Sequence, residues 1–125
     1  MIVVDSSGWI EYFTDGPLAD KLAPYLEDLQ EVVTPTIVIF EVYRVIRRQR
    51  SEEEAIAAVA PMPKTSVVDL DQFLALGAAD VSVVHGLTMA DAIVYATAQA
   101  RGIPMVTADA HIEGLTDARV LTRRS

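Results

Sequence analysis

The chain has 125 residues, a hydrophobic content of 51% and a formal net charge of −8. This size and composition indicate one folded domain over residues 1–125 rather than a disordered segment. The absence of cysteine excludes disulfides, thiolate zinc sites and cysteine nucleophiles, and the negative charge weighs against a general binder of polyanions.

Short apolar runs alternate with helical patterns along the chain. Strands are expected at residues 2–4, 32–33, 65–69 and 105–107, with a fifth candidate at 119–121. Helices are expected at residues 7–13, 18–29, 35–49, 51–61, 71–85 and 88–102. No repeat, low-complexity tract or long linker divides the chain.

Three helix starts carry capping signals. Thr34 is placed as an N-cap with Pro35 at the first helical position. Ser51 and Glu54 have the spacing of a capping box, and Thr88 is placed to cap the helix that follows it.

No targeting or membrane segment is expected. No basic region precedes the apolar run at the N-terminus, which argues against a secretory signal. The longest uninterrupted apolar stretch, residues 55–60, is far too short to cross a bilayer. We therefore expect a cytoplasmic protein without membrane contact.

The alternation of strands and helices predicts an α/β fold, with a parallel sheet covered by helices on both faces. In such sheets, ligands bind beyond the carboxyl ends of the strands. Asp5 directly follows the first strand and Asp109 follows the fourth. Both carboxylates are therefore expected at this edge.

Glu41 is the acid that is hardest to explain by structure alone. It interrupts a mostly apolar helix, with Ile37 and Val45 four residues before and after it on the same face. An acid in such surroundings is costly unless it has a partner. The structural alternative is an intrahelical ion pair with Arg44 or Arg48.

The other three acids also have structural alternatives. Asp5 can cap the next helix, Asp91 stands where a helix dipole favours an acid, and Asp109 can bond to its own backbone in a turn. The α/β topology nevertheless sends these acids and Glu41 toward one sheet edge. Like charges gathered there require protons or hard cations to offset them.

Carboxylate oxygens are the ligands that Mg²⁺ and Mn²⁺ prefer. Such a metal activates water and offsets charge on a phosphoryl group, so the cluster predicts chemistry on phosphate esters. Ser6, Ser7 and Thr107 supply hydroxyls beside the strand ends. Of these, Thr107 is the best candidate for a supporting contact.

The two histidines are weaker candidates. His111 lies two residues after Asp109 and is a candidate contact for substrate or metal, although a lone histidine is more often structural. His85 stands at a helix end before Gly86, where the helix dipole alone explains it.

Arginines cluster in two segments. One is residues 44–50, and the other comprises Arg119, Arg123 and Arg124. Arginine is well suited to bidentate contact with phosphate. The structural alternative is a solvated helix face together with a frayed tail.

Four segments carry the acids in order: residues 1–7 (MIVVDSS), 34–42 (TPTIVIFEV), 87–98 (LTMADAIVYATA) and 106–111 (VTADAH). Together they resemble the PIN-domain family, and within it the VapC-type toxins of bacterial and archaeal toxin–antitoxin systems. The resemblance extends over residues 2–121. One departure is Ile112, where a phenylalanine is expected after the last acid.

The resemblance implies a parallel five-stranded sheet in a three-layer α/β/α fold. It also implies a Mg²⁺- or Mn²⁺-dependent endoribonuclease that cuts RNA by in-line hydrolysis. The implied catalytic quartet is Asp5, Glu41, Asp91 and Asp109, of which Asp5, Asp91 and Asp109 are the expected metal ligands. A homodimer is implied, as is neutralisation by a small cognate antitoxin whose tail covers the active site.

In this light, further residues take on expected roles. Thr107 and Ser6 are the supporting hydroxyls. Arg44 and Arg48, one helical turn apart and near Glu41, are expected to contact RNA phosphate or the antitoxin.

Two other phosphate-handling classes fit poorly. An aspartyl-nucleophile phosphatase needs a second acid two residues after the first, where this chain has Ser7. A phospho-acceptor receiver domain needs a lysine late in the chain, and the only lysines are Lys21 and Lys64. The remaining alternative is a PIN-domain RNA-processing or non-catalytic RNA-binding module without a cognate antitoxin.

Overall fold

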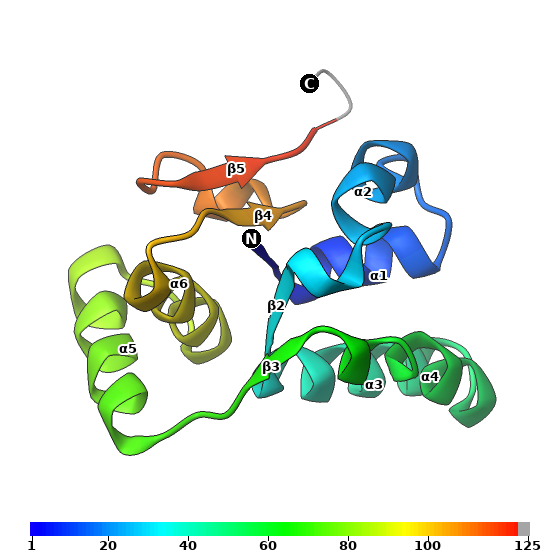
Figure 1. The fold of residues 1–125 in the computed structure, drawn as a ribbon, viewed down its shortest axis with the longest axis horizontal. Coiled ribbons are helices and arrows are strands. Elements are labelled where there is room, and N and C mark those ends of the chain that lie inside the picture. Colours follow the sequence, from blue (N-terminus) through cyan, green and yellow to red (C-terminus); the bar gives the residue numbers. More distant parts are fainter. Residues whose placement is uncertain (123–125) are drawn as a thin grey trace.

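A five-stranded parallel sheet forms the centre of the computed structural model, which describes residues 1–122 (Figure 1). The strands, in sheet order, are β3 (Ser66–Val68), β2 (Val32–Pro35), β1 (Ile2–Val4), β4 (Met105–Thr107) and β5 (Ala118–Val120). The helices are α1 (Ser6–Phe13), α2 (Ala19–Leu26), α3 (Thr36–Gln49), α4 (Glu52–Val59), α5 (Gln72–His85) and α6 (Met89–Arg101). Three short 3₁₀ turns are η1 (Leu29–Glu31), η2 (Met62–Lys64) and η3 (Ala110–Ile112). The predicted α/β class with a parallel sheet is confirmed.

The strand order places a topological switch point between β1 and β4. From β1 the chain builds outward through β2 to β3, then returns to the other side of β1 to form β4 and β5. Right-handed crossovers consequently put α1 to α4 on one face of the sheet and α5 and α6 on the other, as Figure 1 shows. Ligands in open α/β sheets bind at such a switch point.

The central strands are buried on both faces. Val3, Val4, Val32 and Val33 are all fully inaccessible to solvent, because helices cover the sheet from both sides. Ile112, the departure from the family pattern, is also buried in this core.

Helix α6 lies between the sheet and α5. It contacts β1, β2 and β4 as well as α5, and its residues from Ala92 to Ala98 are all buried. Within residues 1–122, no single helix is long and apolar enough to span a membrane; α5 and α6 meet that criterion only as a pair bent by 113°.

The capping predictions are confirmed for two helices and wrong for one. Ser51 accepts the N–H of Glu54 at 3.0 Å, and Thr88 accepts the N–H of Asp91 at 3.4 Å. Thr34, in contrast, is not an N-cap but lies in β2, and α3 begins only at Thr36.

The buried hydroxyl of Thr34 explains the difference. Thr34 pairs with Val67 of β3, and its Oγ1 accepts a hydrogen bond of 2.6 Å from the hydroxyl of Thr65. Sheet pairing and a satisfied buried hydroxyl therefore override the local helix signal. Of the predicted C-terminal arginine cluster, Arg119 lies in β5, whereas Arg123 and Arg124 lie outside the described residues.

Candidate active site

Asp5 lies at the carboxyl end of β1, beside the switch point, and its side chain is buried. Its Oδ1 accepts hydrogen bonds from the N–H of Gly8 at 3.0 Å and the hydroxyl of Ser7 at 2.7 Å, and its Oδ2 accepts one from Thr107 at 2.5 Å. Asp5 is thus also the N-cap of α1, so the structural alternative holds alongside the candidate role. A carboxylate has about four acceptor positions, which leaves one on Oδ2 for a ligand.

Thr107 connects β4 to Asp5 across 102 positions of sequence. It is fully buried, and its Oγ1 accepts the N–H of Asp109 at 2.9 Å. Ser7 lies 3.2 Å from Thr107 Oγ1 and accepts the N–H of Ala108 at 3.0 Å. The hydroxyls of Thr107 and Ser7 therefore fix the turn that carries Asp109 relative to Asp5.

Glu41 reaches the same end of the sheet from α3. It is half-buried, and its Oε1 accepts a hydrogen bond of 2.8 Å from the hydroxyl of Ser6 in the first turn of α1. Glu41 makes no ion pair with Arg44 or Arg48. The intrahelical pair considered from the sequence is therefore absent, and within residues 1–122 the hydrogen-bond partner of Glu41 is Ser6.

Asp91 and Asp109 share a cavity of about 380 Å³. Its lining comprises His85, Gly86, Leu87, Thr88, Asp91, Asp109 and His111. Asp109 turns toward His111, accepting the N–H at 2.9 Å and lying 2.8 Å from the ring Nδ1. The alternative role of Asp109 in its own turn is thus also observed.

His85 stands in the last turn of α5 before Gly86, as expected from the sequence. The structure places it in the same cavity as Asp91 and Asp109. Gly86 makes this possible, because its left-handed conformation (φ 67°) ends α5 and turns the chain toward α6. In the sequence, this shared position is indicated only by the short spacing between His85 and Asp91 across the glycine that separates the two helices.

Three of the acids influence one another electrostatically. Burial raises the pKa of Asp5 to about 6, in spite of its three hydrogen bonds, and the charge of Asp91 adds to the effect. Burial also raises the pKa of Asp91, with a further contribution from the charge of Asp109. Partial burial of Asp109 acts in the same direction, but the hydrogen bonds and charge of His111 lower the pKa of Asp109 overall.

The donor chemistry of these acids fits a hard divalent cation. Mg²⁺ commonly takes one or two protein carboxylates and completes its shell with water. A cation beside Asp5 and Asp91 would favour their ionised forms, which burial disfavours. Within residues 1–122, no group of three or more acidic or histidine side chains is placed to hold a metal ion, so joint ligation by Asp5, Asp91 and Asp109 stays a prediction.

The model of the PIN-domain family matches residues 2–117, nearly the whole chain. The chain belongs to the PIN-domain family. Among curated protein sequences, none is significantly similar to it.

Solved structures of toxins share the fold of this PIN domain. VapC20 of Mycobacterium tuberculosis, described as a sarcin–ricin loop cleaving toxin, has a TM-score of 0.77 at 19% identity, covering 95% of this chain and 99% of that one. A toxin–antitoxin complex from Klebsiella pneumoniae has a TM-score of 0.76 at 19% identity, and the match covers 98% of both chains. FitAcB from Neisseria gonorrhoeae has a TM-score of 0.69 at 18% identity, and the match covers 99% of both chains. At these identities the likeness shows the fold alone, and it confirms the predicted PIN-like architecture.

The raised pKa of Asp5 predicts a pH-dependent stability of the metal-free PIN domain. The pKa of Asp5 is about 6 in the folded chain, whereas its ordinary value, expected in the unfolded chain, is 3.8. Because the folded state binds this proton more tightly, the free energy of unfolding falls as the pH rises from about 4 to about 6. The asparagine in Asp5→Asn does not titrate, so the stability of the variant lacks this pH dependence. Between about pH 4 and pH 7, the free energy of unfolding of the parent should therefore fall by up to about 3 kcal/mol relative to that of the variant.

Denaturant titrations in chelator at pH 4.5 and pH 7.5 measure this difference. Asp20→Asn, an exposed acid on α2, is the matched control and should follow the parent at both pH values. Equal pH dependence of the parent and Asp5→Asn would contradict the assignment.

Proposed function

We propose that this PIN domain is a metal-dependent endoribonuclease and the toxin of a toxin–antitoxin pair. The observation that carries the proposal is the hydrogen bond from Thr107 to Asp5 at the switch point, with Asp91 and Asp109 close enough to act on the same charge cluster. Buried acids with raised pKa values at a switch point are characteristic of a functional site.

Each acid has its own role in the proposed hydrolysis of an RNA phosphodiester. Asp5, Asp91 and Asp109 would hold Mg²⁺ or Mn²⁺, which when bound would activate a water and compensate charge at the phosphoryl group. Thr107 orients Asp5, and Ser6 orients Glu41. Glu41 is left free to accept a proton from the attacking water.

The proposed partners follow from the neighbouring structures. The Klebsiella pneumoniae neighbour is a toxin–antitoxin complex, and a neighbour from Salmonella typhimurium is a VapBC bound to DNA. We propose that a small cognate antitoxin likewise neutralises this chain in the cytoplasm, its tail covering the acids. Arg44 and Arg48 are proposed to contact RNA phosphate or that antitoxin.

Cleavage of RNA in Mn²⁺ tests the proposed chemistry. Asp5→Asn and Glu41→Gln should each lower the rate at least about 100-fold, and Thr107→Val about 10- to 100-fold through the orientation of Asp5. The exposed Asp20→Asn should cleave like the parent. The proposal would be contradicted if the parent still cleaved RNA in the presence of chelator. It would also be contradicted if Asp5→Asn cleaved RNA at the rate of the parent.

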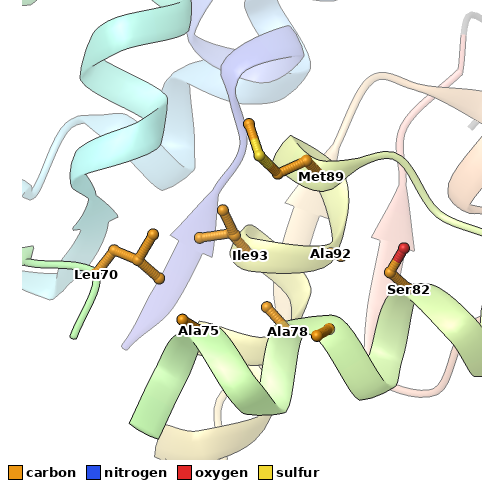
Figure 2. A pocket seen from close by; sticks show the side chains of 8 residues that line it. Leu70, Ala75, Ala78, Ser82, Met89, Ala92 and Ile93 are labelled. Carbon is orange, nitrogen blue, oxygen red and sulfur yellow. The ribbon is translucent and has the colours of Figure 1, made fainter. Parts of the chain in front are cut away.

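We also propose a homodimer whose interface includes the outer face of α5. Four apolar side chains there, Phe73, Leu76, Val83 and Val84, are each more than 60% exposed. Beside this α5 face lies an apolar cavity of about 300 Å³ between α5 and α6. Half of the residues that line it are alanines, and the exposed Met89 is another (Figure 2).

The exposure of this α5 face suits a second copy of the chain. Together with Met89 it presents five large apolar side chains that are each more than 60% exposed, and large exposed apolar patches mark association sites. Gly77, in the middle of the face, has nothing within 4 Å of its missing Cβ and would let two helices approach closely.

A charge placed on the α5 face should separate the copies. In Leu76→Glu the two introduced carboxylates would face an apolar partner surface, so the dimerisation Kd should rise at least about 100-fold. Light scattering coupled to gel filtration measures the mass. Ile56→Glu, at a similarly exposed site on α4, is the control. A monomeric parent would refute the dimer.

A further inference from the structure

Helix α3 carries an exposed surface of aromatic and arginine side chains beside Glu41. A groove of about 430 Å³ is lined by Phe40, Tyr43, Arg44, Arg47 and Arg48. These residues recur at the three- and four-residue spacing that places them on one side of a helix. We refer to them as the α3 groove.

Phe40 is not part of the core. It is 61% exposed, whereas Val38, Val42 and Ile46 on the opposite side of α3 are completely buried against the sheet and its neighbours. The fold therefore does not require a phenylalanine at this position. An exposed aromatic ring of this size is available to stack against a planar ligand.

The arginines of the α3 groove are unpaired. Among residues 1–122, Arg44, Arg47 and Arg48 form no ion pair, whereas the neighbouring Arg50 lies 3.4 Å from Glu54. Three free guanidinium groups within one and a half turns make a local positive surface on a chain whose net charge is −8. Arginine forks match phosphate oxygens bidentately.

We propose that the α3 groove binds single-stranded RNA, with an unpaired base stacked on Phe40 and the adjoining phosphates held by Arg44, Arg47 and Arg48. The inference rests on the proposed ribonuclease function and names the form of its substrate. Stacking on aromatics within a positive groove is how proteins hold single strands, whose bases are accessible. In a duplex the base faces are stacked on one another and cannot reach Phe40.

The position of the groove supports this assignment. It begins at Phe40, next to Glu41, and continues for about two turns, or ~12 Å, along α3. RNA entering the acidic site would be repelled by Asp5, Asp91 and Asp109, and the α3 groove supplies the opposite charge on the helix that carries Glu41. Its charged side chains are all cationic, which matches an anionic, planar ligand rather than a mixed protein surface.

Binding of labelled RNA to the full chain in an Asp5→Asn background, which separates binding from cleavage, tests the proposal. The probes are a fluorescein-labelled single-stranded RNA of mixed sequence and the same RNA in a blunt duplex, followed by anisotropy. Phe40→Ala should weaken single-strand binding about tenfold or more, and Phe40→Trp should restore it. Tyr12→Ala, at an exposed aromatic residue on α1, should bind like the background chain.

Salt dependence tests the phosphate contacts independently. Arg47→Ala should weaken binding and reduce the magnitude of the slope of log K against log salt by about 0.7, which corresponds to the loss of one phosphate contact with a single strand. Arg101→Ala, an exposed arginine at the end of α6, should change neither. An unchanged slope in Arg47→Ala would count against its phosphate contact.

The outcomes separate this inference from the proposed function. If the parent cleaves RNA but Phe40→Ala binds single strands unchanged, the α3 groove is not the RNA site and the inference is overturned. It is also overturned if Phe40→Ala weakens duplex binding equally, or instead weakens self-association or antitoxin binding with RNA affinity intact. If the parent never cleaves but Phe40→Ala loses single-strand binding, the groove stands and the proposed chemistry fails.

Discussion

The hydrogen bond between Thr107 and Asp5 joins the ends of β1 and β4, and the arrangement of the acidic site depends on it. Burial disfavours the ionised form of Asp5, and its three hydrogen bonds offset only part of this effect, so the pKa of Asp5 stays raised. The same threonine fixes the turn that presents Asp109. One buried hydroxyl thus couples the folding of the switch point to the geometry of the site.

The surfaces with proposed roles lie on different elements around this switch point. Asp5 and Asp109 follow β1 and β4, Asp91 shares a cavity with Asp109, and Glu41 lies on α3. The arginines also line α3, and the unpartnered apolar side chains lie on α5. Figure 1 shows α3 and α5 on opposite faces of the sheet. Binding of RNA on α3 and self-association through α5 are therefore sterically compatible, and neither needs the net charge of the chain to be positive.

The alternation of apolar runs and helical patterns was sufficient to predict the parallel sheet and to place Asp5 and Asp109 at its carboxyl edge. Thr34 was misplaced because its local capping signal is weaker than pairing with β3 and the bond to Thr65, neither of which is visible locally. The cavity position of His85 depends on the turn between α5 and α6. The exposure of Phe40 depends on which side of α3 meets the sheet, which an unbroken apolar run does not reveal.

The central claim is that Asp5, Asp91 and Asp109, from three parts of the chain, form one site for a divalent cation. Paramagnetic broadening by Mn²⁺ in ¹H–¹⁵N spectra of the labelled chain tests it most directly. The account predicts selective loss of the amide signals of Asp5, Asp91 and Asp109 and of their neighbours, with little effect in Asp5→Asn. Broadening centred instead on the three glutamates that begin α4, Glu52 to Glu54, or an unaffected Asp5 region, would contradict it.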